Sequence, residues 1–103
     1  MSEEKLKVDK LRTLDEEVST EVMGLRLLRY AVRYYSTDIA AAWDMEEEIQ
    51  RRGLYAKYGE AMSVLLDSPF VTASFYDFLH ASPELRCRAA LLTVRAAHSR
   101  PEP

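Results

Sequence analysis

Residues 11–39 have the sequence LRTLDEEVSTEVMGLRLLRYAVRYYSTDI, and this stretch decides the fold class. Its apolar side chains recur at steps of three and four residues, a spacing that places them on one face of an α-helix and is not that of a strand. The stripe consists of Leu11, Leu14, Val18, Val22, Leu25, Leu28, Val32, Tyr35 and Ile39. We therefore expect a long amphipathic helix that continues to about Ser36.

Two arrangements of the N-terminal region fit this pattern. Residues 13–16, Thr-Leu-Asp-Glu, match a capping box, in which Thr13 begins a helix and Glu16 bonds back to it. In that case a short helix or frayed start over residues 1–12 precedes a helix from Thr13 to Ser36. Otherwise one helix covers both segments. The sequence leaves this choice open.

Capping residues predict four further helices. Residues 36–38, Ser-Thr-Asp, are N-cap residues, and Gly53 after two arginines is typical of a helix end. We expect one helix over 39–52 and another from 54 to about 67. Ser-Pro pairs at 68–69 and 82–83 each begin a helix, over 69–80 and 83–98, because proline is tolerated at the first helical position. Expected inward residues are Ile39, Ala42, Trp43, Ile49, Phe70, Ala73, Phe78, Leu85, Ala89 and Leu92.

The composition is that of a small all-α domain. The chain has 103 residues, of which 48% are hydrophobic and 30% charged, so it has enough apolar area to fold. Three glycines and four prolines are too few for many strands and tight turns. We expect a bundle of about four to five helices: a long N-terminal helical hairpin plus two shorter C-terminal helices. Residues 13–99 would form the single domain, and 100–103 a disordered tail.

Cysteine use and charge limit the compartment and the partners. Cys87 is the only cysteine, which excludes an intramolecular disulfide and favours the reducing cytoplasm. The acidic start and the lack of a long apolar run predict neither a secretory signal nor a membrane anchor. A net charge of −3 gives no overall attraction to nucleic acid or anionic lipid, so only a local patch would argue for either.

The first candidate site is an arginine and tyrosine surface within the opening stretch. It consists of Arg26, Arg29, Arg33, Tyr30 and Tyr34. Such a surface suits a phosphate, a base or a protein partner. In the alternative interpretation the chain folds back at 36–38, and Arg26 and Arg29 form ordinary interhelical ion pairs with the acidic residues 44–48. Trp43 and the six tyrosines add aromatic area that a partner would cover, although each tyrosine ring is equally explained as core.

The second candidate site is a helix-turn-helix at the C-terminal end. The helices over 69–80 and 83–98 are joined by a short break, and Arg86, Arg88 and Arg95 make the last helix basic. Glu84 at the start of this helix, where a base-reading residue is wanted, argues against DNA binding. We keep DNA binding as the alternative function.

Neither metal binding nor catalysis is expected from the sequence. Asp77 and His80 lie three residues apart, but a carboxylate-bridged metal site needs such a pair on two helices, so no metal or cofactor is expected. No strand-turn-helix elbow or glycine-rich loop is present to expose a nucleophile. Cys87 lies between two arginines, which would favour its thiolate if it were exposed, yet packing in the core is the expected outcome.

These observations favour a non-enzymatic module that binds a protein partner, as an adaptor, inhibitor, chaperone-like protein or regulatory subunit. The proposed contact residues are Arg26, Arg29, Tyr30, Arg33, Tyr34 and Trp43. A helix of about 24 residues would be about 36 Å long, too long for a domain of about 13 Å radius to cover. A homodimer with a four-helix core is therefore expected.

Overall fold

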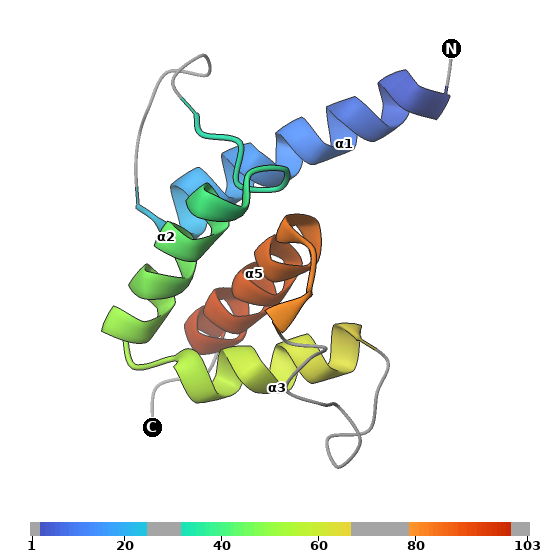
Figure 1. Cartoon of the computed structure of the whole chain (residues 1–103). Coiled ribbons are helices and arrows are strands. Elements are labelled where there is room, and N and C mark those ends of the chain that lie inside the picture. The colour runs from blue at the N-terminus through green and yellow to red at the C-terminus, as the bar shows by residue number, and fades with distance from the viewer. Residues whose placement is uncertain (1–2, 25–31, 67–78, 100–103) are drawn as a thin grey trace.

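The computed structural model describes residues 3–24, 32–66 and 79–99, and all of its regular elements are helices. Figure 1 shows α1 (Glu3–Glu17), α2 (Ile39–Arg51) and α3 (Tyr55–Leu65) arranged around α5 (Pro83–Ser99). The predicted all-α class is confirmed. None of the helices in these ranges is long and apolar enough to cross a membrane.

The N-terminal helix is a single helical run over residues 3–22. The α-helix α1 continues directly into η1 (Val18–Val22), one turn of π-helix. Of the two arrangements that the sequence left open, the structure has no helix start at Thr13, because α1 runs through this residue and the Thr13 hydroxyl donates to the Asp9 carbonyl at 3.0 Å, as a hydroxyl does inside a helix. A helix continuing to Ser36 is wrong. Gly24 has φ +68°, the left-handed conformation that ends a helix, and residues 32–38 form a loop and turn.

A buried carboxylate holds that loop against α1. Asp15 is buried, and its Oδ1 accepts the backbone N–H of Ser36 at 2.8 Å. The Ser36 hydroxyl donates to the Leu11 carbonyl at 3.2 Å, and Arg12 donates to the Val32 carbonyl at 3.3 Å. The chain therefore returns along α1 through side-chain to backbone bonds rather than through a second long helix.

The predicted ends of α2 are confirmed. The Asp38 side chain accepts the N–H of Ala40 at 3.0 Å. At the other end Gly53 has φ +75°, and the N–H of Leu54 donates to the Ile49 carbonyl at 3.1 Å, which is a Schellman motif. This turn sends α3 away beside α2.

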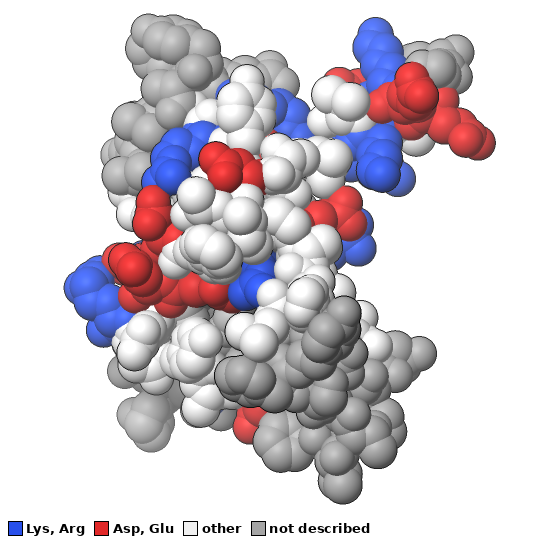
Figure 2. Space-filling view, in the orientation of Figure 1, with Lys and Arg blue, Asp and Glu red and all other residues white. Residues whose placement is uncertain are grey.

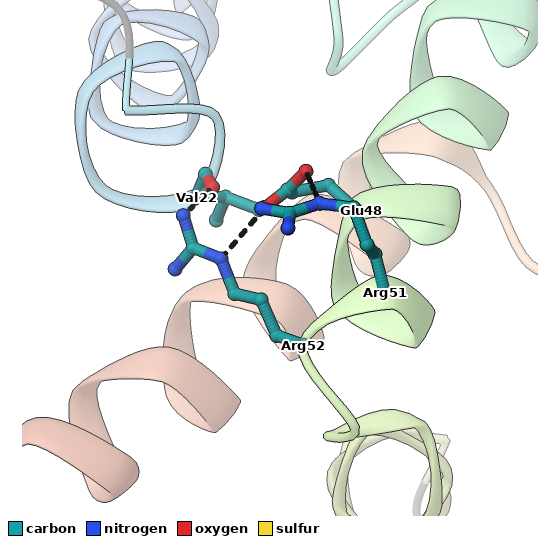
Figure 3. A network of polar contacts seen from close by, with 4 residues as sticks. All are labelled: Val22, Glu48, Arg51 and Arg52. Carbon is teal, nitrogen blue, oxygen red and sulfur yellow. Dashed lines mark hydrogen bonds and ion pairs between the residues drawn. The ribbon is translucent and has the colours of Figure 1, made fainter.

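A network of arginines joins the end of α2 to the end of η1 (Figure 3). Glu48 accepts the Nε of Arg51 at 2.9 Å and the Nε of Arg52 at 2.8 Å. These two guanidinium groups lower the pKa of Glu48 to about 2. Arg52 also donates to the Val22 carbonyl, so the residue that follows α2 caps the last turn of η1.

Helix α5 is the centre of the bundle, in contact with α1, η1, α2 and α3. Its start is as predicted, because the Ser82 hydroxyl accepts the N–H of Leu85 at 3.1 Å. Small side chains let the other helices approach closely, and its buried apolar residues are Cys87, Ala89, Ala90, Leu91 and Val94. The packing of Cys87 is confirmed, and burial, with nearby carboxylates, raises the pKa of its thiol to about 12.

Some predicted positions differ or cannot be compared. Trp43 and Leu92 were expected to point inward, but 54% and 47% of their surfaces are exposed. The predicted helix over 69–80 lies outside the described residues, apart from its last two. Phe70, Ala73, Phe78 and the tail over 100–103 also lie outside them.

Candidate functional site

A pocket of about 540 Å³ lies between α2 and α3, beside the start of α5. We call it the aromatic pocket. Its lining residues are Trp43, Glu46, Tyr55, Tyr58, Gly59, Met62, Leu79 and Arg86. The volume lies within the range typical of sites that hold a small molecule or a few buried side chains.

Helical spacing explains why these residues meet. Trp43 and Glu46 are three residues apart on α2 and share one face of it. Tyr55, Tyr58 and Met62 follow one another at steps of three and four on α3. The Gly53 turn places α3 against α2, so the two faces form opposite walls.

A bonded charge network forms the base of the pocket. Arg86 and Glu46 pair at 2.7 Å, and their side chains are only 8% and 13% exposed. Arg86 also donates to the carbonyls of Leu79 and Ala81, each at 3.0 Å, and the Tyr58 hydroxyl donates to Glu46. A charge removed from water is tolerated when its bonding capacity is used in this way. The base is thus fixed before any ligand arrives.

Burial, together with the neighbouring Glu46, sets the ionisation of Tyr58. Burial raises the pKa of its hydroxyl far above the ordinary value, and the neighbouring Glu46 carboxylate raises it further. The hydroxyl is therefore protonated throughout the physiological range, where it serves as a donor to Glu46.

The rim of the pocket is apolar and exposed. Trp43, Tyr55 and Leu79 expose 54%, 52% and 60% of their surfaces. Tyr55 stacks on Tyr58 with ring centroids 5.7 Å apart, so one ring is held at the rim by another in the wall. Large exposed aromatic side chains around a pocket are the usual anchor sites of protein partners.

The acidic residues of α2 differ in how they are paired. Asp44 pairs with Arg33 at 2.6 Å, Glu46 with Arg86, and Glu48 with Arg51 and Arg52. Glu47 is exposed and has no ion pair within residues 3–24, 32–66 and 79–99. Figure 2 shows acidic side chains gathered over α2 next to an uncharged area. This face therefore keeps one unpaired negative charge within the described chain, one helical turn after Trp43.

The predicted partner-binding residues do not all meet. Trp43 is at the rim of the aromatic pocket, and Arg33 is held beside α2 by Asp44. Tyr34 is 62% exposed, with the guanidinium of Arg12 over its ring at 4.9 Å, and it is not part of the pocket lining. Arg26, Arg29 and Tyr30 lie outside the described residues, so their pairing with α2 stays a prediction.

The arginines assigned to DNA binding are all engaged. Arg86 is buried in the base of the pocket, which corrects its assignment to a surface that contacts phosphates. Arg88 pairs with Glu84 at 3.5 Å, and Arg95 pairs with Glu17 and Glu21 of the N-terminal run. The charge of each is therefore compensated within the domain.

The third predicted site involved Asp77 and His80. His80 is exposed in the turn that precedes α5, and Asp77 lies outside the described residues. Within the described ranges no group of three histidine, cysteine or acidic side chains has metal-binding geometry.

Sequence reasoning found part of the pocket. Trp43, Tyr55 and Tyr58 were among the aromatic candidates for a surface that a partner covers. Glu46, Met62 and Leu79 were missed, because their roles depend on contacts between helices. No protein family model matches the chain, and no curated protein or solved structure is significantly similar to it.

Proposed function

We propose that this chain is a non-enzymatic protein-binding module, and that its aromatic pocket receives an apolar side chain of a partner protein. One observation carries the proposal: Trp43 and Tyr55 are both more than half exposed at the rim of a pocket whose base is already fixed by the Arg86–Glu46 pair. Binding at a preformed pocket avoids the cost of ordering the site, which favours affinity.

The test is co-purification of the untagged chain from its own cells, analysed by native mass spectrometry. We expect a partner in fixed stoichiometry with the unmodified chain. Trp43→Ala and Tyr55→Ala should each weaken its retention by at least about fivefold, because truncating an aromatic anchor typically costs more than about 1 kcal/mol.

Val8→Ala is the matched control. Val8 is 62% exposed on α1 and is not part of the pocket lining, so its truncation removes exposed apolar area without touching the site. Circular dichroism would confirm that all three variants are folded. Equal retention of the partner by Trp43→Ala and the unmodified chain would refute the proposal.

A homodimer and a cytoplasmic location remain proposals. The N-terminal helical run ends at Val22, so a dimer built on a long helix is not supported, but a different apolar surface is exposed on α3 and α5, where Val64 is 74% exposed next to Leu92. Leu92→Glu should convert a dimer to a monomer in light scattering, whereas a monomeric unmodified chain would exclude the dimer. The free, buried thiol of Cys87 is the observation that supports a reducing compartment.

A further inference from the structure

The charge pattern next to the aromatic pocket indicates what kind of partner it accepts. Four acidic residues lie within residues 44–48 of α2. Three of them are neutralised by arginines from the loop before α2, from the end of α2 and from α5. Glu47 is the exception: it is exposed, and no lysine or arginine of residues 3–24, 32–66 and 79–99 pairs with it.

Glu47 lies one helical turn after Trp43, a rise of about 6 Å along α2. A partner helix lying along the α2–α3 groove therefore reaches both residues from one of its faces, with an apolar side chain in the pocket and a second side chain beside Glu47. Residues one turn apart on that partner helix have the matching separation. A groove between two helices is a usual receptor for an amphipathic helix.

We propose that the aromatic pocket selects a basic amphipathic helix, with an apolar anchor for the pocket and a lysine or arginine one turn away that pairs with Glu47. This proposal rests on the proposed function and adds the chemistry of the partner to it. Glu47 is then a specificity-determining residue, whereas Trp43 supplies affinity for any apolar anchor.

The experiment uses the single tryptophan of the chain as its reporter. Trp43 is the only tryptophan, and it is at the rim, so a helical peptide without tryptophan that enters the pocket shifts its emission to shorter wavelength. Three synthetic peptides share the same leucine and phenylalanine face. They differ only in having lysine, glutamine or glutamate at the flanking positions.

We expect the lysine peptide to bind most tightly and the glutamate peptide least. Glu47→Gln should weaken the lysine peptide about two- to fivefold, the effect of one exposed ion pair, and leave the glutamine peptide unchanged. Added salt should remove the difference in lysine-peptide affinity between the unmodified chain and Glu47→Gln. Glu60→Gln is the matched control, because Glu60 is an exposed acid on α3 that is not part of the pocket lining.

The outcomes separate the two proposals. If the lysine and glutamine peptides bind equally and Glu47→Gln has no effect, the basic-partner proposal is overturned while the pocket keeps its role as an anchor site. If none of the three peptides shifts the Trp43 emission, the proposed function itself fails. If Glu60→Gln weakens the lysine peptide as much as Glu47→Gln does, the attraction is general and Glu47 is not the specificity determinant.

Discussion

Replacing Arg86 by methionine tests how the pocket is built. Arg86 joins three parts of the fold, because it pairs with Glu46 of α2 and donates to the carbonyls of Leu79 and Ala81 before α5. Methionine keeps most of the apolar volume of the side chain but removes every donor. The variant leaves the Glu46 carboxylate, 13% exposed, without its cation.

The loss is large because water does not replace the missing partner. Removing one partner of a buried ion pair typically destabilises the fold by about 3–5 kcal/mol. Because Glu46 is partly exposed, we expect Arg86→Met to cost about 3 kcal/mol. Since domains of this size are stable by about 5–15 kcal/mol, the variant remains folded but is clearly weakened. The melting temperature should fall by about 12–20 °C.

Urea unfolding followed by circular dichroism measures the effect. Arg88→Met is the control on the same helix, where the side chain is 58% exposed and pairs with Glu84 at 3.5 Å. That exposed pair should contribute less than about 1 kcal/mol. Adding Glu46→Met to Arg86→Met removes the uncompensated carboxylate and should restore part of the loss. If Arg86→Met costs no more than Arg88→Met, the network does not hold the pocket together.

Three further predictions follow from local geometry. Because folding lowers the pKa of Glu48 from 4.5 to about 2, the stability that its ion pairs contribute is complete above pH 5 and should decline as the pH drops toward 2. Urea titrations at several pH values should show a smaller decline for Glu48→Gln. If the free energy of unfolding depends on pH equally in both proteins, the network is not the source of the decline. The Cys87 thiol, with a pKa of about 12, should react with a disulfide reagent only as fast as the chain opens, so rapid modification in native buffer would contradict its burial. Gly53→Ala should destabilise the fold by about 1 kcal/mol, because Gly53 has φ +75°, whereas Gly59→Ala within α3 should stabilise it by about 0.5–1 kcal/mol. In thermal unfolding the melting temperature should therefore fall for the first variant and rise for the second. A shift in the same direction for both would refute the backbone argument.

Three helix ends, at Asp38, Gly53 and Ser82, were predictable because each is set by local chemistry. Asp38, Gly53 and Ser82 act on backbone groups within a few residues, so short sequence patterns contain the whole interaction. The end of η1 was not predicted. Apolar residues continue at helical spacing past Gly24, and a spacing pattern cannot register a change of backbone direction at one glycine.

The inner face of α2 shows a second limit of periodicity. Ile39, Ala42, Trp43 and Ile49 are the more hydrophobic set, but the buried residues of α2 are Ala41, Ala42, Met45 and Ile49. Small alanines let α5 approach closely, and a tryptophan at that contact would hold the helices apart. Trp43 is therefore displaced to the edge of the contact, where more than half of its surface is exposed.

Ion pairs are harder to predict from sequence than helix ends, because the two partners of an ion pair can lie far apart along the chain. Glu46 and Arg86 are separated by 40 residues, and Arg95 by more than 70 from the acids it binds. By composition, α5 is basic and α2 acidic, which would suggest opposite surfaces for nucleic acid and for cations. Folding sets most of these charges against one another, so net charge per helix does not describe the surface. Among the acidic residues of α2, Glu47 is the one without an ion pair in the described chain, and it lies one turn from the exposed ring of Trp43.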